Sequence, residues 1–152
     1  MGTIYEVPDR RYWVIRADSG NFYAPFLRHA VVALGHVDDI HIDVVGVAAQ
    51  RNWVDLLRAL RRSEDATLEG KRRASMRLRQ TRQFVEEVSI DDWVVTVGHD
   101  QLAIGRVVSE AYRAKEALIF ESRSGGTVVM PYQLRRDVAW GPTVNRRQLS
   151  PS

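Results

Sequence analysis

Aromatic rings and short polar side chains gather in the first quarter of the chain, in a combination that suits the binding of a planar ring. Stacking on an aromatic side chain contributes about 1–3 kcal/mol per base, and a few fixed polar groups then read the edge of the ring. Candidate pocket residues of both kinds are Trp13, Asp18, Ser19, Asn21, Phe22, Tyr23, His36 and Asp38. The alternative is that the rings fill the core, which we favour for Trp13 and Phe26, whereas Tyr23 and His36 are expected at a pocket rim.

A second group of chemically suitable residues is a run of cations in the middle of the chain. Arginine presents a planar fork that matches phosphate oxygens, and six such contacts would make binding steeply dependent on salt. Candidate phosphate-binding residues are Lys71, Arg72, Arg73, Arg77, Arg79 and Arg82. The alternative is a solvated helix face whose cations pair with neighbouring carboxylates such as Glu64 and Glu69.

Catalytic and metal-binding patterns are weak throughout. The chain has no cysteine, and its four histidines lack the spacing of metal ligands. Glu69 and Lys71 formally supply the Glu-x-Lys of a metal-dependent nuclease, but that chemistry needs the pair on a strand beside a further carboxylate. The sequence therefore predicts no enzyme, no cofactor and no metal site.

The elements that position these residues are strands first, helices in the middle and strands again at the end. Trp53, Leu56, Leu57 and Leu60 follow helical spacing, and residues 40–44 alternate weakly as a strand would. Gly105 interrupts a strand and predicts a bulge. Expected helices are 22–29, 53–60 and 71–88, with a loop at 63–70, and expected strands are 11–17, 30–34, 93–97, 102–112, 117–122, 127–130 and 132–140.

This order is typical of an α+β fold, and we expect a small, curled antiparallel β-barrel with flanking helices. The length of 152 residues suits one domain over residues 1–152, and no apolar run is long enough to span a bilayer. Residues 1–11 lack the apolar stretch of a signal peptide, and the absence of cysteine fits a reducing cytoplasm. We therefore expect a cytoplasmic location.

Several short segments resemble the N-terminal sensor module of Mrr-type restriction and related defence proteins. They are residues 13–17, the aromatic helix after them, residues 31–35, residues 82–88 and 92–96, residues 104–107 and residues 135–140. That module is similar to the PUA-like superfamily, near its EVE and YTH branches, whose compact barrels hold a nucleotide in an aromatic pocket. The resemblance implies nucleic-acid sensing, with an effector such as a nuclease in a separate domain beyond this chain.

The leading hypothesis is a reader of a modified or extruded base, in DNA rather than RNA, that serves a restriction or defence system. A sensor of a free nucleotide or nucleotide second messenger and a protein-interaction domain are the alternatives. The net charge of +3 is small, and the distribution of the charges along the chain is more informative than their sum.

Overall fold

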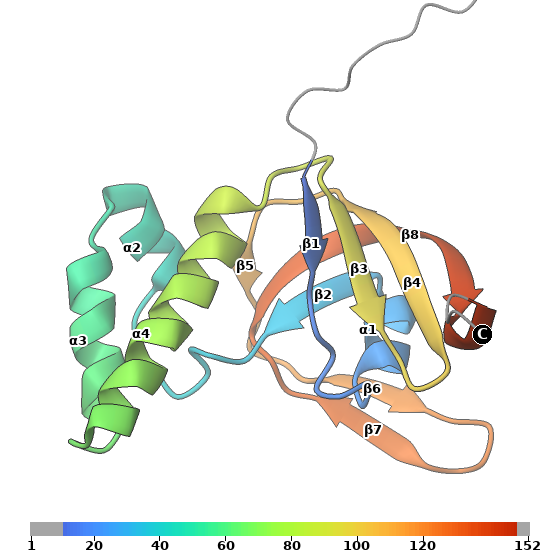
Figure 1. Ribbon diagram of the computed structural model, residues 1–152, viewed down its shortest axis with the longest axis horizontal. Coiled ribbons are helices and arrows are strands. Elements are labelled where there is room, and N and C mark those ends of the chain that lie inside the picture. The colour runs from blue at the N-terminus through green and yellow to red at the C-terminus, as the bar shows by residue number, and fades with distance from the viewer. Residues whose placement is uncertain (1–10, 149–152) are drawn as a thin grey trace, which may run out of the picture.

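A curled β-sheet with a group of helices beside it makes up the fold in the computed structural model, which describes residues 11–148 (Figure 1). The mixed α+β class predicted from the sequence is confirmed. The ends of the expected 1–152 domain, residues 1–10 and 149–152, lie outside the described residues. The strands are β1 (Tyr12–Val14), β2 (Val31–Leu34), β3 (Trp93–Val97), β4 (Gln101–Val107), β5 (Tyr112–Arg113), β6 (Leu118–Glu121), β7 (Thr127–Met130) and β8 (Leu134–Asn145).

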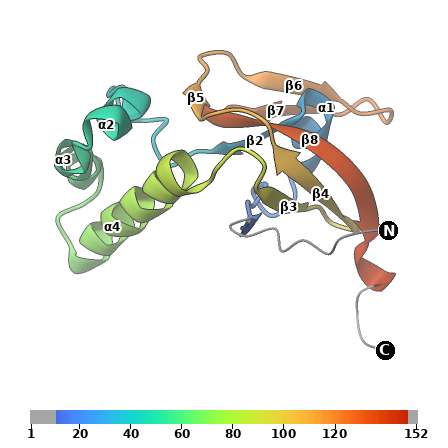
Figure 2. The same cartoon turned by 90° about the horizontal axis from the view of Figure 1, so that it is seen from above.

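The sheet is organised around β8, which curves across the molecule (Figure 2). The strand order is β1-β3-β4-β8-β2, and β5 pairs with the start of β8 beside this path. The bulge predicted at Gly105 is confirmed as a break in register between β4 and β8. Within the described residues, β1 and β2 stand at the two ends of the order and do not pair with each other. We call the opening between them the seam.

The pairing of β1 departs from the antiparallel sheet that the sequence predicts. β1 runs parallel to β3, with Trp13 opposite Val94, whereas the other strand pairs are antiparallel. Parallel neighbours need a long crossover connection, and the residues between β1 and β3 include all the long helices. A hairpin-based expectation misses this pairing because the two strands are far apart in sequence.

The helices are α1 (Tyr23–His29), α2 (Val44–Gln50), α3 (Trp53–Ser63) and α4 (Leu68–Arg82), with a π-helix, η1 (Gln83–Glu87), and a short 3-10 helix, η2 (Arg146–Gln148). The strand predicted around residues 40–44 is wrong, because the Asp43 side chain accepts a hydrogen bond from Gly46 N at 3.0 Å and caps α2 instead. The loop predicted at 63–70 is too long, because Thr67 accepts a hydrogen bond from Gly70 N at 3.1 Å and starts α4.

Strand boundaries also differ from prediction. The strand expected at 11–17 is confined to Tyr12–Val14, because the chain leaves β3 after Ile15 and enters the turn before α1. The strand expected at 102–112 ends at Val107, and a separate short strand, β5, follows it on the same edge of β8. The strand expected at 132–140 continues through Gly141 and Pro142 to Asn145, because β4 supplies a partner edge along this whole length. The extension to Asn145 makes β8 long enough to reach from β2 to the far end of β4.

Helices α2, α3 and α4 lie together on one side of the sheet, and we call them the helical arm (Figure 1). Three arginines join the arm and its connections to the strands by donating to backbone carbonyls. Arg77 donates to His36 O at 2.9 Å and 2.6 Å, and Arg113 donates to Ile40 O and Ile42 O, both at 2.7 Å. The fully buried Arg136 of β8 donates to carbonyls of η1 and the residue after it. The end of α4 is thereby held against the sheet at the seam.

None of the helices between residues 11 and 148 has both the length and the apolar character that a membrane span requires.

Candidate functional site

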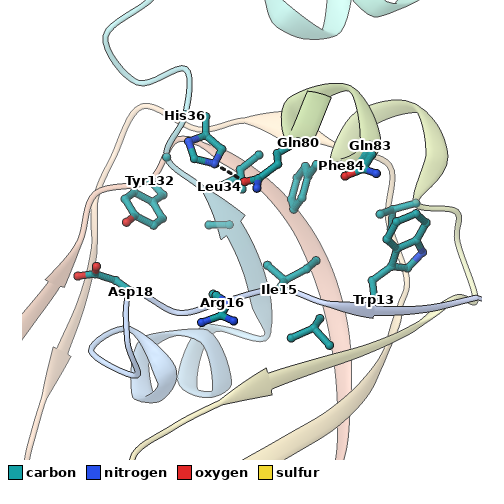
Figure 3. Close-up of a pocket in the computed structure, with 14 residues that line it drawn as sticks. Trp13, Ile15, Arg16, Asp18, Leu34, His36, Gln80, Gln83, Phe84 and Tyr132 are labelled. Atoms are coloured by element: carbon teal, nitrogen blue, oxygen red, sulfur yellow. Dashed lines mark hydrogen bonds between the residues drawn. The ribbon is translucent and has the colours of Figure 1, made fainter. Parts of the chain in front are cut away.

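A cavity of about 480 Å³ fills the seam between β1 and β2, with the end of α4 and η1 as its third side (Figure 3). Ligand sites for small molecules occupy roughly 300–1,000 Å³, so this cavity has the size of a binding site. Its lining combines three aromatic rings with amide, imidazole and charged groups. The residues that matter for chemistry are Trp13, Arg16, Asp18, His36, Gln80, Gln83, Phe84 and Tyr132.

Backbone groups of the two unpaired sheet edges add to this lining. Ile15 N donates to Val95 O at 3.0 Å, so the alternate residue Val14 directs its N–H and C=O away from β3 and towards the seam. Val138 N donates to Ala30 O at 2.9 Å, which by the same alternation turns the backbone of Ala33 towards the seam. Val14 and Ala33 both line the cavity. The seam thus offers main-chain donors and acceptors from both sides.

A buried carboxylate, that of Asp92, fixes the position of the Trp13 ring in the wall of the cavity. The indole Nε1 of Trp13 donates to Asp92 Oδ2 at 2.9 Å, and Ser89 N donates to the same oxygen at 2.9 Å. Burial disfavours the charged form of Asp92, which is 3% exposed, but the hydrogen bonds from Ser89, Trp13 and Arg11 together lower its pKa below the ordinary carboxyl value. Asp92 is therefore ionised at neutral pH and fixes the indole plane.

This arrangement predicts a specific dependence of stability on pH. Because the folded-state pKa of Asp92 is lowered, its stabilising effect is complete above the unfolded carboxyl pKa, about 3.9, and is lost as the pH falls through the folded value. We expect Asp92→Asn to lower the free energy of unfolding by about 1–3 kcal/mol at pH 7. Urea unfolding at pH 3 and pH 7 measures both effects. If the wild type and Asp92→Asn differ in free energy of unfolding by the same amount at pH 3 and pH 7, Asp92 does not have a lowered pKa in the folded protein.

Tyr132 stands on the opposite side of the cavity from Trp13 (Figure 3). Its ring lies against Gly35, where an added Cβ would approach Tyr132 Cε1 to 2.4 Å, so only glycine admits the ring there. Phe22 meets the same ring edge-on, with the centroids 5.0 Å apart and the planes at 87°. Burial raises the pKa of the Tyr132 hydroxyl, and the nearby carboxylates of Asp18 and Asp38 raise it further. The hydroxyl is therefore a neutral donor at pH 7.

The third side comes from the junction between α4 and the π-helix η1. Val88 N donates to Gln83 O at 2.9 Å, a spacing of five residues that widens the last turn. Such π-turns are rare and occur frequently at functional sites. They bring Gln80, Gln83 and Phe84 to one side of the helix, where all three line the cavity. Arg136 supports this turn by donating to Phe84 O at 3.0 Å and to Val88 O.

His36 and Gln80 form a pair between the two aromatic walls (Figure 3). The His36 Nε2 to Gln80 Oε1 distance is 2.5 Å, and because an amide oxygen carries no hydrogen, the imidazole is the donor. This leaves the Gln80 amide NH₂ as a donor at the cavity. The peptide oxygen of His36 is itself held by Arg77, so the imidazole is positioned from both ends.

The structure brings together three of the predicted pocket residues, namely Trp13, Asp18 and His36. Phe22 supports the cavity from behind Tyr132. The other predicted residues lie elsewhere: Ser19 and Asn21 in the turn before α1, Tyr23 with its ring against Gly98, and Asp38 accepting a hydrogen bond from Gln133 N at 3.0 Å. Burial raises the pKa of Asp38, and the bond from Gln133 opposes that rise. Phe26 is fully buried in the core, as favoured from the sequence, whereas Trp13, for which the core was also favoured, is only partly buried and lines the cavity.

Sequence reasoning missed Arg16, Gln80, Gln83, Phe84 and Tyr132 as cavity residues. Phe84 falls inside the helix predicted at 71–88, and nothing in its spacing indicates that one side of it faces a cavity. The glutamines have the character of ordinary surface helix residues. Their role depends on where α4 ends in space, which no local pattern specifies.

The six predicted phosphate-binding cations divide into two sets. Arg77 is 11% exposed and is bonded to His36 O, Glu64 and Asp39, while Arg73 pairs with Glu64 and Asp65 at 3.0 Å each. Arg82 pairs with Glu86 at 3.3 Å and lies over the Trp53 ring, 5.6 Å from its centroid. Lys71, Arg72 and Arg79 form the second set, which shares a shallow depression on the outer face of α4.

The possible nuclease pair does not form a metal centre among the described residues. Glu69 and Lys71 lie in the first turns of α4 rather than on a strand, and Glu69 pairs with Arg72 at 3.4 Å. Between residues 11 and 148, no three His, Asp or Glu side chains are grouped so that they could hold a metal ion.

Comparison of the chain with protein-family models, curated proteins and solved structures found no match. Function is therefore inferred from the cavity and from the charges around it.

Proposed function

We propose that this chain is a non-catalytic recognition module that holds one extruded base of a nucleic acid in the seam cavity. The observation that carries the proposal is the placement of two aromatic rings, Trp13 and Tyr132, across a cavity whose lining includes the side-chain amides of Gln80 and Gln83 (Figure 3). Planar rings stack on such walls, and stacking tolerates any base. The polar groups between the walls then select among bases.

The polar side chains of the lining are of the kinds that reading a base edge requires. Gln80 supplies an amide NH₂, Gln83 supplies a whole amide, and Asp18 supplies a carboxylate that also accepts from Asn21 Nδ2 at 3.2 Å. Donors and acceptors are therefore both available, as they must be for a heterocycle that carries ring nitrogens, carbonyls and exocyclic amines. An apolar ligand would leave these groups unpaired at a cost of about 1–3 kcal/mol each.

The wider biological setting of the proposal comes from the resemblance to restriction-associated sensor modules. The curled sheet, with a ligand-sized opening at its seam, is compatible with a PUA-like barrel completed by its ligand. That resemblance favours DNA over RNA, a modified base over a plain one, and an effector domain elsewhere. A cytoplasmic role in defence is part of the same proposal.

A free nucleotide is the second candidate, favoured by the size of the cavity. Its volume of about 480 Å³ leaves room beyond a single heterocycle, and Arg16 lies at its edge, where a phosphate would be neutralised. A protein-interaction domain has less support, because the polar groups lie inside a cavity rather than on a flat surface.

Binding of short, fluorescently labelled DNA duplexes that carry one 5-methylcytosine, one 6-methyladenine or no modification tests the proposal. We expect one modified duplex to bind more tightly than the plain duplex, and Tyr132→Ala to remove that preference. Thermal stabilisation by mononucleotides without any duplex binding would favour the second candidate. Binding to neither ligand would overturn both.

A further inference from the structure

The outer face of α4 carries cations that the protein itself leaves largely unneutralised. Lys71, Ser75 and Arg79 follow one another at intervals of four residues and so lie on one side of the helix. Among the described residues Lys71 and Arg79 make no ion pair, and Arg72 has one exposed pair with Glu69, at 3.4 Å. Exposed pairs of this kind contribute little, about 0–1 kcal/mol.

The carboxylates that pair with Arg73 and Arg77 lie on the other side of α4. Glu64 and Asp65 bind Arg73, and Glu64 and Asp39 bind Arg77. These contacts neutralise the side of the helix that is turned towards α3 and the connection after β2. The separation of acidic partners from the outer cations leaves a positive face directed to solvent. We call Lys71, Arg72, Ser75, Met76 and Arg79, which line a depression of about 270 Å³, the basic strip.

The basic strip ends next to the seam cavity. Arg79 belongs to the strip, and its neighbour Gln80 lines the cavity, as does Gln83 one turn further on. From Gln80 back to Arg72 the helix rises about 12 Å, at about 1.5 Å per residue. Figure 1 shows α4 as one continuous helix that runs from the far end of the arm to the sheet. A ligand that extends out of the cavity along α4 therefore meets the cations of the strip next.

We propose that the basic strip binds the sugar–phosphate backbone of the strand whose base occupies the seam cavity. This inference rests on the proposed function and adds the path of the polymer to it. Arg72, Arg79 and Lys71 contact phosphates, the Ser75 hydroxyl donates to a phosphate oxygen, and Met76 packs against a sugar. A nucleic-acid strand fits because it joins a planar ring to a row of negative charges, which an acidic peptide does not.

The strip predicts a defined salt dependence for a single strand. Three phosphate contacts give a slope of log affinity against log salt of about −2, which is roughly a 20-fold loss of affinity between 50 and 200 mM salt. Arg79→Gln is expected to weaken binding of a single-stranded DNA decamer several-fold and to reduce the slope by about 0.7. Arg123→Gln, an identical charge change in the turn between β6 and β7, is the matched control and is expected to change neither quantity.

The experiment uses two probes, the labelled decamer and a set of uncharged nucleosides: deoxycytidine, 5-methyldeoxycytidine, deoxyadenosine and 6-methyldeoxyadenosine. Arg79→Gln should leave nucleoside affinity unchanged while weakening the decamer. Equal decamer affinity in Arg79→Gln and Arg123→Gln would contradict the proposed role of the basic strip. Displacement of the labelled decamer by polyglutamate as effective as displacement by unlabelled decamer would contradict it too. Neither result would contradict nucleoside binding in the cavity. If the wild-type protein binds neither probe, the proposed function fails together with the strip.

Discussion

Replacing Arg136 with methionine is expected to lower the free energy of unfolding by about 3–5 kcal/mol, a large fraction of the stability of a domain of this size. Arg136 is fully buried, and its guanidinium donates to Phe84 O at 3.0 Å, to Val88 O and to Ser109 O at 3.2 Å. Burial lowers the pKa of this arginine, and an exposed carboxylate, Glu110, opposes the shift from 3.4 Å. Methionine fills much of the volume but leaves the three carbonyls without donors.

The same substitution is expected to disturb the seam cavity, because two of those carbonyls belong to η1 and the residue that follows it. The side chain of Phe84 lines the cavity from this turn, so loosening the turn moves one cavity wall. Urea unfolding followed by circular dichroism measures the free energy of unfolding. Binding of the labelled decamer at one fixed salt concentration measures the effect on the cavity. We expect both to fall together in Arg136→Met.

Arg106→Met is the matched control for this prediction. Arg106 lies on β4 with its side chain 46% exposed and pairs with Asp91 at 3.5 Å, so its loss is expected to cost at most about 1 kcal/mol. Equal destabilisation by the two substitutions would mean that the buried hydrogen bonds of Arg136 contribute nothing beyond a surface pair.

The elements that the sequence predicts well are those with a strong periodic pattern or a clear turn. The helical spacing of Trp53, Leu56 and Leu60 identifies α3, and the Gly125–Gly126 turn identifies the β6–β7 hairpin. The helix α2 escapes prediction because its residues are mostly β-branched or small. A side chain outside it, the Asp43 cap, together with packing against α3, decides its conformation.

The candidate site was harder to predict, for a different physical reason. From the sequence alone, an arginine whose side chain links two elements by hydrogen bonds cannot be distinguished from an arginine that is exposed to solvent. Arg77 and Arg79 are two residues apart on one helix, yet one is bonded to His36 O and the other lines the outer depression. Only the position of Glu64, Asp39 and the connection after β2 separates their roles, and those contacts are long-range.

The seam explains why residues distant in sequence share one site. A sheet whose end strands do not pair leaves two edges with unused backbone groups, and such edges attract a partner. In this fold α4 and η1 cover the opening only partly, so a cavity remains between helix and edges. A ligand there would contact β1, β2 and the helical arm at once.

Trp13→Ala is expected to weaken binding of the cognate base about 5- to 150-fold, which corresponds to the loss of about 1–3 kcal/mol of stacking. The indole is the wall that Asp92 holds in place, and Tyr132 on the opposite side cannot supply its surface. Trp13→Phe keeps an aromatic face but loses the hydrogen bond to Asp92, so we expect an intermediate loss. Fluorescence anisotropy with the labelled decamer, at one fixed salt concentration, measures all three proteins.

The matched control is Trp93→Ala, because Trp93 lies on the neighbouring strand, packs against Tyr12 with the ring centroids 6.5 Å apart, and does not line the cavity. Circular dichroism and the thermal midpoint of each variant separate loss of folding from loss of binding. Equal weakening by the two alanine variants at equal folded fraction would show that neither ring stacks on the ligand. A selective loss in Trp13→Ala, with its salt slope unchanged, would separate base stacking in the seam from phosphate binding on the strip, because an apolar wall contributes no counterion release.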